Sequence, residues 1–199
     1  MKSLIITLLC SFCLSTTNAQ SYFRQCGIQL LTKQNGLSNN TLTGIYQDKV
    51  GFLWLGTDVG LSRYDGIHFH NYNLIDKEPR ALAHLYETSN NLLWSHIANL
   101  NQIACFDKMR GIYMPLISPT PEVLKDIQDI CVLQDKLYAL TSNVIVELKM
   151  EKNADEIRLT AQPLIDIKTK VLRLYNNEDI LCALTVAVSY THLTLPTIC

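Results

Sequence analysis

The sequence lacks the signatures of most common chemistries. Its 199 residues contain no glycine-rich phosphate-binding loop, no G-x-S-x-G nucleophile turn and no H-E-x-x-H motif. The cysteines beyond the N-terminal apolar stretch, Cys26, Cys105, Cys131 and Cys182, form no C-x-x-C pair, which argues against zinc. A formal net charge of −1 offers no basic surface to nucleic acid or anionic lipid. We therefore predict no enzyme, catalytic residue, metal, cofactor or nucleic-acid partner for this chain, and its ligand-binding residues stay unassigned.

Long apolar runs are also missing, with a partial exception at the N-terminus. Lys2 precedes the apolar stretch Leu4–Leu14, and Thr17-Asn18-Ala19 supplies small residues before Gln20. This pattern predicts a secretory signal peptide over residues 1–19. The alternative, an uncleaved anchor, is disfavoured because a spanning helix needs about 20 apolar residues. We expect the mature chain to be periplasmic and to meet the membrane only through segments further along the protein.

Export permits disulfides, yet the cysteines favour another state. Cys105, Cys131 and Cys182 each lie within apolar, strand-like sequence. Buried free thiols are therefore expected at these three positions in preference to disulfides.

Short alternating segments separated by tight turns are what the chain has in abundance. In residues 41–72, strands are predicted over 41–47, 52–57, 61–64 and 67–72. Gly51, Gly60 and Asp65-Gly66 provide the turns between them. Residues 20–40 are interpreted as an N-terminal strand, Tyr22–Leu31, followed by a turn-rich linker.

The same pattern returns at a regular interval. Leu42, Tyr46, Leu53 and Trp54 recur as a second set 40 residues later: Leu82, Tyr86, Leu93 and Trp94. Weaker copies follow, in which Tyr138 and Cys182 take the place of the tryptophan, at further steps of 44 residues. A four-strand unit that repeats about every 40–45 residues is typical of a β-propeller blade.

The repeat predicts an all-β fold, a partial β-propeller over residues 41–187. At about 42 residues per blade, this segment makes about three and a half four-stranded blades, whereas propellers close with about four to eight. We expect such an incomplete wheel to expose unpaired strand edges and to oligomerise or aggregate when expressed alone. Residues 188–199 break the pattern and resemble a non-native tail translated from adapter-like DNA.

The first blade carries a dense motif. Gly36-Leu37-Ser38-Asn39 leads into it, and the pattern D-x-x-G-F-x-W-x-G-T-x-x-G-L-x-R-Y-D-G then runs from Asp48 to Gly66. This block resembles the two-component-regulator propeller repeat, which opens the periplasmic sensor domain of hybrid two-component systems (histidine kinase and response regulator) in Bacteroidetes. The second copy departs from the family pattern, with Ser95-His96 where Leu55-Gly56 stands in the first.

The resemblance implies a seven-bladed propeller and a role in extracytoplasmic ligand sensing. Ligands of such receptors are typically oligosaccharides from complex polysaccharides, and a homodimer of the full-length receptor is compatible with the resemblance. Two alternatives stay open: a secreted propeller enzyme acting on polysaccharide, and a structural propeller that binds protein. The kinase, receiver and DNA-binding parts of such receptors have no counterpart in this sequence.

Individual residues with chemical potential each have a structural interpretation. Trp54 and Trp94 could stack on sugars, but their recurrence favours packing between blades. His68 and His70 share one strand face without a third ligand, and His84 and His96 carry no visible pattern. The carboxylates in turns are expected to cap backbone N–H groups instead of forming a catalytic or calcium site; they are Asp48, Asp58 and Asp65.

Overall fold

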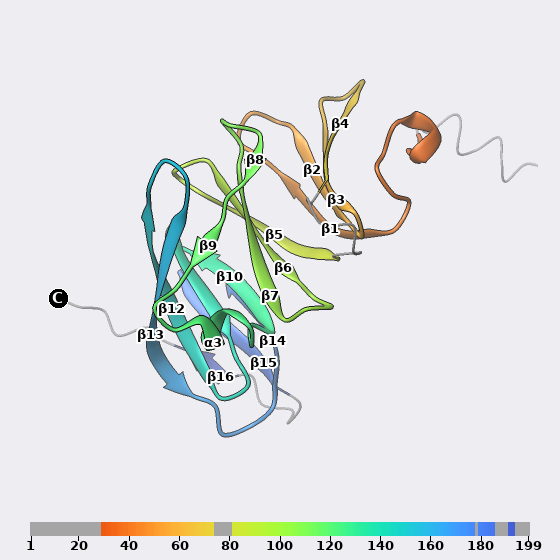
Figure 1. Ribbon diagram of the computed structural model, residues 1–199. Helices are drawn as coiled ribbons and strands as arrows, with labels where there is room; N and C mark the ends of the chain where they lie inside the picture. Colours follow the sequence, from red (N-terminus) through yellow and green to blue (C-terminus); the bar gives the residue numbers. More distant parts are fainter. Residues whose placement is uncertain (1–28, 74–80, 178, 186–190, 194–199) are drawn as a thin grey trace, which may run out of the picture. The chain divides into compact units, whose positions relative to one another are not determined.

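The computed structural model of the protein describes residues 29–73, 81–177, 179–185 and 191–193 (Figure 1). Residues 1–32 and 33–199 form two separate contact units, and the fold described below belongs to the second. The predicted signal peptide lies outside the described residues, as does most of the predicted N-terminal strand. Its described end, residues 29–31, is not in a strand.

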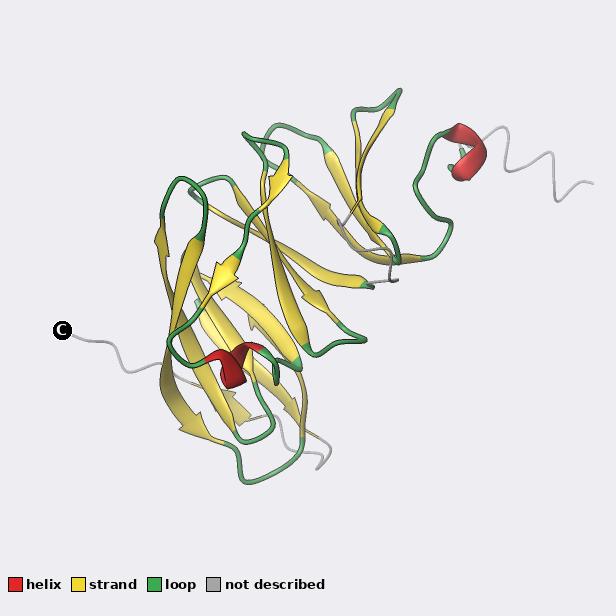
Figure 2. Ribbon diagram, viewed as in Figure 1, coloured by secondary structure: helices red, strands yellow, loops and turns green. Residues whose placement is uncertain are grey.

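Antiparallel strands make up most of the described chain (Figure 2). The first sheet is four-stranded, with order β1-β2-β3-β4: β1 (Leu42–Gln47), β2 (Leu53–Thr57), β3 (Gly60–Tyr64) and β4 (Phe69–Asn73). The second has order β5-β6-β7-β8: β5 (Leu82–Thr88), β6 (Leu92–Ile97), β7 (Gln102–Asp107) and β8 (Ile112–Tyr113). A 3-10 turn, η2 (Lys33–Asn35), precedes the first sheet.

Two further sheets follow in chain order. The third has order β10-β11-β12-β13-β9, in which β9 is parallel to β13: β9 (Leu116–Ile117), β10 (Asp129–Leu133), β11 (Lys136–Leu140), β12 (Val144–Lys152) and β13 (Ile157–Asp166). The fourth has order β14-β15-β16: β14 (Val171–Asn177), β15 (Ile180–Thr185) and β16 (Thr191–Leu193). A short helix, α3 (Pro121–Leu124), joins β9 to β10.

The sheets are arranged as successive blades. The first strand of each sheet contacts the first strand of the next, from β1 to β5, from β5 to β10 and from β10 to β14. Meandering antiparallel sheets whose first strands lie side by side are the blades of a propeller. The prediction of an all-β partial propeller is confirmed, and we call the four sheets blades 1 to 4.

The repeated aromatic positions lie at equivalent places in the blades. In each blade the second strand presents one buried residue to a partner on the first strand: Trp54 to Tyr46, Trp94 to Tyr86, Tyr138 to Cys131 and Cys182 to Tyr175. Exposure of these four second-strand residues is 2%, 0%, 1% and 4%. The packing interpretation of Trp54 and Trp94 is confirmed, since neither ring is available to a sugar.

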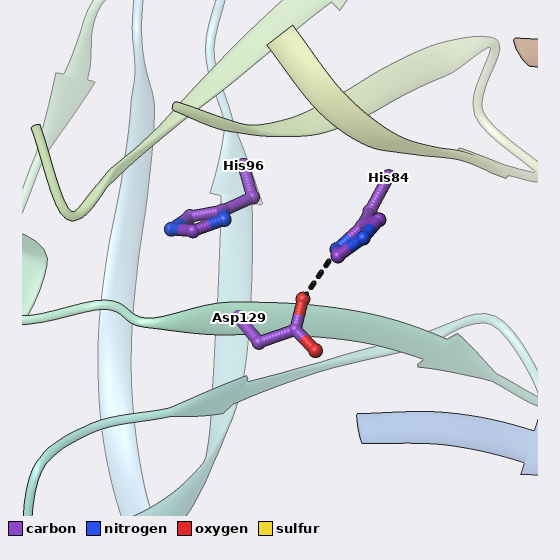
Figure 3. A group of neighbouring side chains, drawn as sticks. All are labelled: His84, His96 and Asp129. Carbon is purple, nitrogen blue, oxygen red and sulfur yellow. Dashed lines mark hydrogen bonds and ion pairs between the residues drawn. The ribbon is translucent and has the colours of Figure 1, made fainter. Parts of the chain in front are cut away.

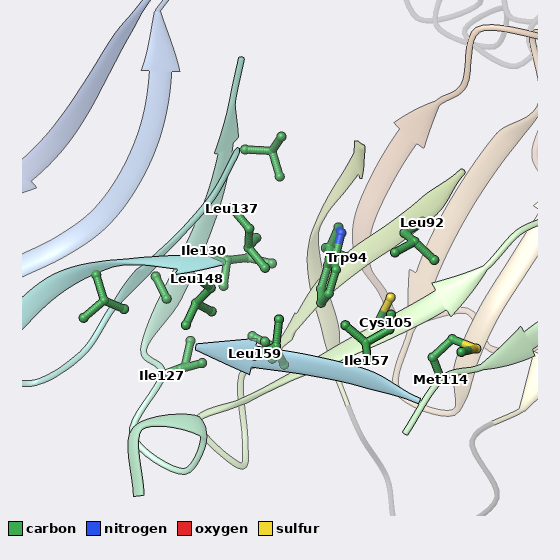
Figure 4. Close-up of a cluster of buried hydrophobic side chains, with 14 residues drawn as sticks. Leu92, Trp94, Cys105, Met114, Ile127, Ile130, Leu137, Leu148, Ile157 and Leu159 are labelled. Atoms are coloured by element: carbon green, nitrogen blue, oxygen red, sulfur yellow. The ribbon is translucent and has the colours of Figure 1, made fainter. Parts of the chain in front are cut away.

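The hydrophobic core lies between neighbouring blades. Figure 4 shows the cluster shared by blades 2 and 3, in which Trp94 lies beside side chains of both sheets. A second cluster contains Trp54 and joins blades 1 and 2, where Phe106 lies 5.6 Å from Trp54 between ring centroids. Large aromatic side chains thus act as wedges that hold one sheet against the next.

Asp48 explains the D-x-x-G-F-x-W spacing of the first blade. Its Oδ1 accepts the backbone N–H groups of Val50, Gly51 and Phe52, at 3.0–3.1 Å, and closes the turn between β1 and β2. Its Oδ2 accepts the indole N–H of Trp54 at 2.9 Å. Burial alone raises the pKa of Asp48, but the hydrogen bonds from Trp54 and Lys108 outweigh it and hold the pKa below the usual value.

Ion pairs between lysines and buried carboxylates join the blades on the side of these turns. Lys108, in the turn after β7, lies 2.9 Å from Asp48 of blade 1 and 2.7 Å from Glu87 of blade 2. One blade further, Lys152 lies 2.8 Å from Asp107. The Lys108–Asp48 and Lys152–Asp107 pairs follow the same pattern: a lysine of one blade neutralises a turn carboxylate of the blade before it.

The remaining predictions have mixed outcomes. Cys105, Cys131 and Cys182 are buried free thiols, as expected. The predicted non-native tail lies largely outside the described residues, but Thr191–Leu193 forms β16, which extends blade 4 beyond the point where the sequence pattern ends. The origin of residues 188–199 stays a prediction.

Glycine is required where blades 1 and 2 meet. A Cβ added at Gly56 would lie 2.0 Å from the carbonyl oxygen of Leu82, and the same oxygen accepts the hydroxyl of Thr43 at 2.8 Å. We predict that Gly56→Ala destabilises the fold by about 1–3 kcal/mol, because backbone must move to admit the methyl group. Gly44→Ala is the graded comparison, since its nearest contact would be 3.1 Å. Urea denaturation measures both, and an equal or smaller loss for Gly56→Ala would refute the close-packing argument.

The two tryptophans should respond differently to phenylalanine. Trp54 donates to the Asp48 carboxylate, whereas Trp94 donates to the Thr88 hydroxyl at 3.1 Å. Both variants should lose a similar amount of stability through poorer packing. The lost hydrogen bond should lower the free energy of unfolding by a further amount, about 1–3 kcal/mol for the charge-assisted bond in Trp54→Phe and about 0.5–1.5 kcal/mol in Trp94→Phe. Thermal unfolding of the two variants tests the order, and a larger loss for Trp94→Phe would contradict it.

Candidate functional site

One equivalent position on the first strands is glycine in blade 1 and a polar residue in blades 2 to 4. This position lies two residues before the first-strand residue that pairs with Trp54 or its equivalent in the other blades. It is Gly44 in blade 1, His84 in blade 2, Asp129 in blade 3 and Arg173 in blade 4. Because the first strands of successive blades are neighbours, the three side chains come together. With His96 they form what we call the inner cluster.

A hydrogen-bonded chain runs across three blades of the inner cluster. His84 Nδ1 lies 2.6 Å from Asp129 Oδ1 (Figure 3), and the Arg173 guanidinium contacts His84 Nε2. A carboxylate only accepts and a guanidinium only donates, so His84 is protonated on Nδ1 and accepts at Nε2. The Asp129 side chain is 1% exposed and that of His84 is 24% exposed, so the chain leads from the interior toward solvent.

Asp129 also binds the backbone of two blades. Its Oδ1 accepts the N–H of Ile130 at 2.9 Å, and its Oδ2 accepts the N–H of Leu174 at 2.7 Å. Leu174 belongs to β14, so this one carboxylate connects blades 2, 3 and 4. A buried carboxylate with backbone donors is fixed in position and can orient whatever it contacts.

His96 is the most buried imidazole of the inner cluster, at 5% exposure. Its Nε2 lies 3.0 Å from the carbonyl oxygen of Ile127, which can only accept, so Nε2 carries the proton. Burial lowers the pKa of His96 more than the Ile127 contact raises it, and the ring is neutral at pH 7. The Nδ1 atom therefore keeps its lone pair. The rings of His84 and His96 are stacked, with centroids 6.3 Å apart.

The backbone at His84 is strained. Its φ of 50° lies in the left-handed region that non-glycine residues rarely adopt. The strain coincides with a register shift between β5 and β6 at Ala83–Tyr86. Strained residues persist where surrounding structure holds them, and they concentrate at functional positions.

The sequence interpretation of His84 and His96 was wrong, because the structure brings them together. The signal was present in the repeat: His84 aligns with Gly44 and His96 with Gly56, so both inner glycines of the first blade become histidine in the second. The two histidines become part of a site only because the fold brings them close to Asp129, which lies 33 residues beyond His96 in the sequence. The ligand-capable atoms of His84, His96 and Asp129 lie within 4.8 Å of one another.

Other residues considered from sequence remain apart from the cluster. His68 has a side-chain exposure of 73% and lies 3.9 Å from Asp65, and His70 is exposed. Asp48 and Asp65 accept backbone N–H groups in their turns, so the turn interpretation is confirmed for these two. Asp58 lies in the turn between β2 and β3.

The hollows in the described part of the chain include two that a ligand could enter. One of about 260 Å³ lies between blades 3 and 4 and is lined by Gln128, Thr141, Ser142, Lys168, Thr169 and Lys170 among others. The other, of about 600 Å³, is lined mainly by apolar side chains of β7, β8, β9 and α3. Gln128, which lines the first hollow, precedes Asp129 in the sequence, and the lining of this hollow offers amide, hydroxyl and ammonium groups. It is the better match for a polar ligand.

Comparison with known proteins agrees with the propeller geometry. The family model for the two component regulator propeller matches residues 36–59. The extracellular domain of the putative hybrid two component system BT3049 from B. thetaiotaomicron is similar at 21% identity and a TM-score of 0.56, over 83% of this chain and 26% of that one. The corresponding domain of BT4673, a putative one component system from the same organism, has 17% identity and a TM-score of 0.57, over 79% and 24%.

An enzyme shares the fold as well. A catalytically inactive variant of virginiamycin B lyase from Staphylococcus aureus, in a structure with quinupristin, is 17% identical with a TM-score of 0.54, over 81% of this chain and 59% of that one. No curated protein matches the sequence. This chain spans about a quarter or less of the length of the B. thetaiotaomicron domains.

The described chain is thus part of a β-propeller. The match to the two-component regulator propeller covers residues 36–59, which include β1 and β2 of the first blade, and the resemblance seen in the sequence is confirmed there. None of the helices in the described part of the chain has the length and apolar character needed to cross a lipid bilayer.

Asp129 should stabilise the fold through its contacts with three blades. Asp129→Asn places an NH₂ group where backbone or histidine N–H groups now donate, and we expect a loss of about 1–3 kcal/mol. Combined with His84→Gly, the two losses should be non-additive by about 0.5–3 kcal/mol, because the residues share a hydrogen bond. Urea denaturation of the double-mutant cycle measures the coupling. Asp126→Asn is the control, since Asp126 binds Ser142 and not the cluster; additive losses would show that His84 and Asp129 do not interact.

Proposed function

We propose that this chain is part of the extracytoplasmic ligand-sensing domain of a hybrid two-component receptor. The observation that carries the proposal is the family match at residues 36–59, in a fold similar to the extracellular domain of the putative hybrid two component system BT3049. The apolar N-terminal segment and its small-residue cleavage pattern support an exported, periplasmic location.

The proposed ligand class is an oligosaccharide derived from a complex polysaccharide. The hollow between blades 3 and 4 supports this choice, because hydroxyl, amide and ammonium groups can donate to and accept from sugar hydroxyls. Gln128 Nε2 donates to Ser142 Oγ at 2.9 Å, and the Asp126 carboxylate accepts from the same hydroxyl at 2.7 Å. Such a network holds polar groups in fixed directions toward a ligand.

Signalling would follow from differential binding. A ligand that contacts the loops of two blades favours the arrangement in which those loops are correctly spaced, and it shifts the population toward that arrangement. This step does not require a dimeric receptor, since a shift within one propeller is sufficient to change the surface that it presents to the next domain.

Oligosaccharide binding can be measured on the extracytoplasmic part of the protein that contains this chain. Isothermal titration with size-fractionated neutral and acidic oligosaccharides should identify a saturable 1:1 ligand. Gln128→Ala and Thr169→Ala should each weaken it about 2–10-fold, as expected for loss of one hydrogen bond. Gln162→Ala, on the exposed surface of β13, should leave the affinity unchanged. The absence of saturable binding across the panel would defeat the proposal.

A polysaccharide-degrading lyase is the second candidate. The similarity to virginiamycin B lyase supports it, together with a histidine held by a buried carboxylate in the inner cluster. A lyase releases unsaturated products that absorb ultraviolet light, whereas a sensor returns its ligand unchanged. Mass spectrometry of the oligosaccharides after prolonged incubation separates these functions: intact ligand supports the sensor, and shortened unsaturated products support the lyase.

A further inference from the structure

We propose that His84, His96 and Asp129 form a binding site for a divalent transition-metal ion, zinc foremost, between blades 2 and 3. The inference stands on the inner cluster and does not rest on the proposed sensing function. Two imidazoles and one carboxylate are ligands that zinc accepts, and three protein ligands leave a coordination position open.

The directions of the donor atoms fit a metal. His96 donates its Nε2–H to the carbonyl of Ile127, which turns the unprotonated Nδ1 away from that carbonyl. An imidazole that ligates through one nitrogen while its other N–H is held by a backbone carbonyl is the usual arrangement around protein-bound metals. Figure 3 shows the His96 and His84 rings on the same side of the Asp129 carboxylate.

The distances require only a small adjustment. The candidate ligand atoms of the three residues already lie within 4.8 Å of one another. Zinc bonds of about 2.0–2.2 Å at tetrahedral angles separate neighbouring ligand atoms by about 3.3 Å. The 2.6 Å separation of His84 Nδ1 and Asp129 Oδ1 would widen toward that value, while any separation longer than about 3.3 Å, within the limit of 4.8 Å, would contract.

Metal binding has a defined proton balance. The ion replaces the proton that now joins His84 Nδ1 to Asp129, and the neutral His84 ring then carries its proton on Nε2. Because the ring proton only moves from one nitrogen to the other, zinc enters without release of a proton, and the charges of the three side chains stay unchanged. Arg173, which donates to Nε2 in the metal-free arrangement, must then turn away, and its exposed side chain can do so.

The surroundings indicate that the cluster is more than a packing device. Blade 1 fills the two corresponding positions with Gly44 and Gly56, so the blade architecture does not itself require imidazoles there. His84 also adopts a φ of 50°, which glycine would adopt at lower cost. Two histidines have replaced glycines at positions that converge on a buried carboxylate, although packing alone gains little from them.

The test is titration of the full chain with Zn²⁺, and with Co²⁺ as a spectroscopic probe. We expect one ion per chain, with cobalt absorption bands of the intensity typical of a tetrahedral or five-coordinate site. Single variants His84→Gly and His96→Gln should each weaken zinc binding by at least about 10–100-fold, the range that follows even from loss of an outer-shell partner. His84→Gly is suited to this position because glycine accepts the positive φ, so the variant should remain folded.

Matched controls use the histidines of blade 1. His68→Gln and His70→Gln change exposed imidazoles of the same chain and should leave the cobalt spectrum and the zinc affinity unchanged. Arg173→Gln removes a cation from His84 and should tighten zinc binding. A zinc affinity that is indifferent to His84 and His96, or that is lost with His68 or His70, would overturn the proposal. So would the absence of stoichiometric binding to the folded chain, with folding verified by circular dichroism.

Discussion

The close approach of the first strands is the constraint on which the rest of the structure depends. Between blades 1 and 2 this approach is backbone against backbone, since Gly44 of β1 and Gly56 of the adjacent β2 both face the carbonyl oxygen of Leu82 in β5, and Gly56 has no room for a Cβ. The wedge residues can be buried only when the sheets meet this closely, because Trp54 fills the wider space away from the first strands. A blade can therefore vary its wedge from tryptophan to tyrosine or cysteine, provided that its first strand still packs against its neighbour.

The same constraint determines where polar chemistry can occur. Where glycines are replaced by His84 and His96, the interval between first strands must accommodate side chains, and buried polar groups need partners there. Asp129 provides the partner of His84, the carbonyl of Ile127 provides that of His96, and the Leu174 N–H satisfies the second oxygen of Asp129. One pair of glycine replacements in blade 2 thus requires a matching residue in blade 3, which explains why the cluster spans blades.

The fold could be predicted from the sequence because the signals of the propeller repeat come from residues that are close together in the chain. Turn glycines, alternation and the Asp48–Trp54 spacing all lie within one blade, so each can be recognised locally. The inner cluster could not be predicted in this way, since His84 and Asp129 are 45 residues apart and meet only through the contact of β5 with β10. An alignment of the repeats would have shown His84 and His96 opposite Gly44 and Gly56. Asp129, however, aligns with glycine, histidine and arginine in the other blades, so the alignment does not show that it contacts His84. The strand β16 was missed for a related reason: its pairing with β15 leaves no periodic signal in so short a segment.

The cost of the inner cluster bears on its purpose. A non-glycine residue at positive φ costs about 1–3 kcal/mol, and a buried carboxylate must recover its desolvation energy from its hydrogen bonds. The Lys108–Asp48 and Lys152–Asp107 pairs between blades avoid the first cost, because none of these four residues has a positive φ and the lysines reach their partners through flexible side chains. Stability could have been obtained at the first strands as it is in blade 1, with glycine and close backbone contact. A strained histidine beside a second histidine and a buried aspartate is better explained by something that the three residues hold than by the packing they provide.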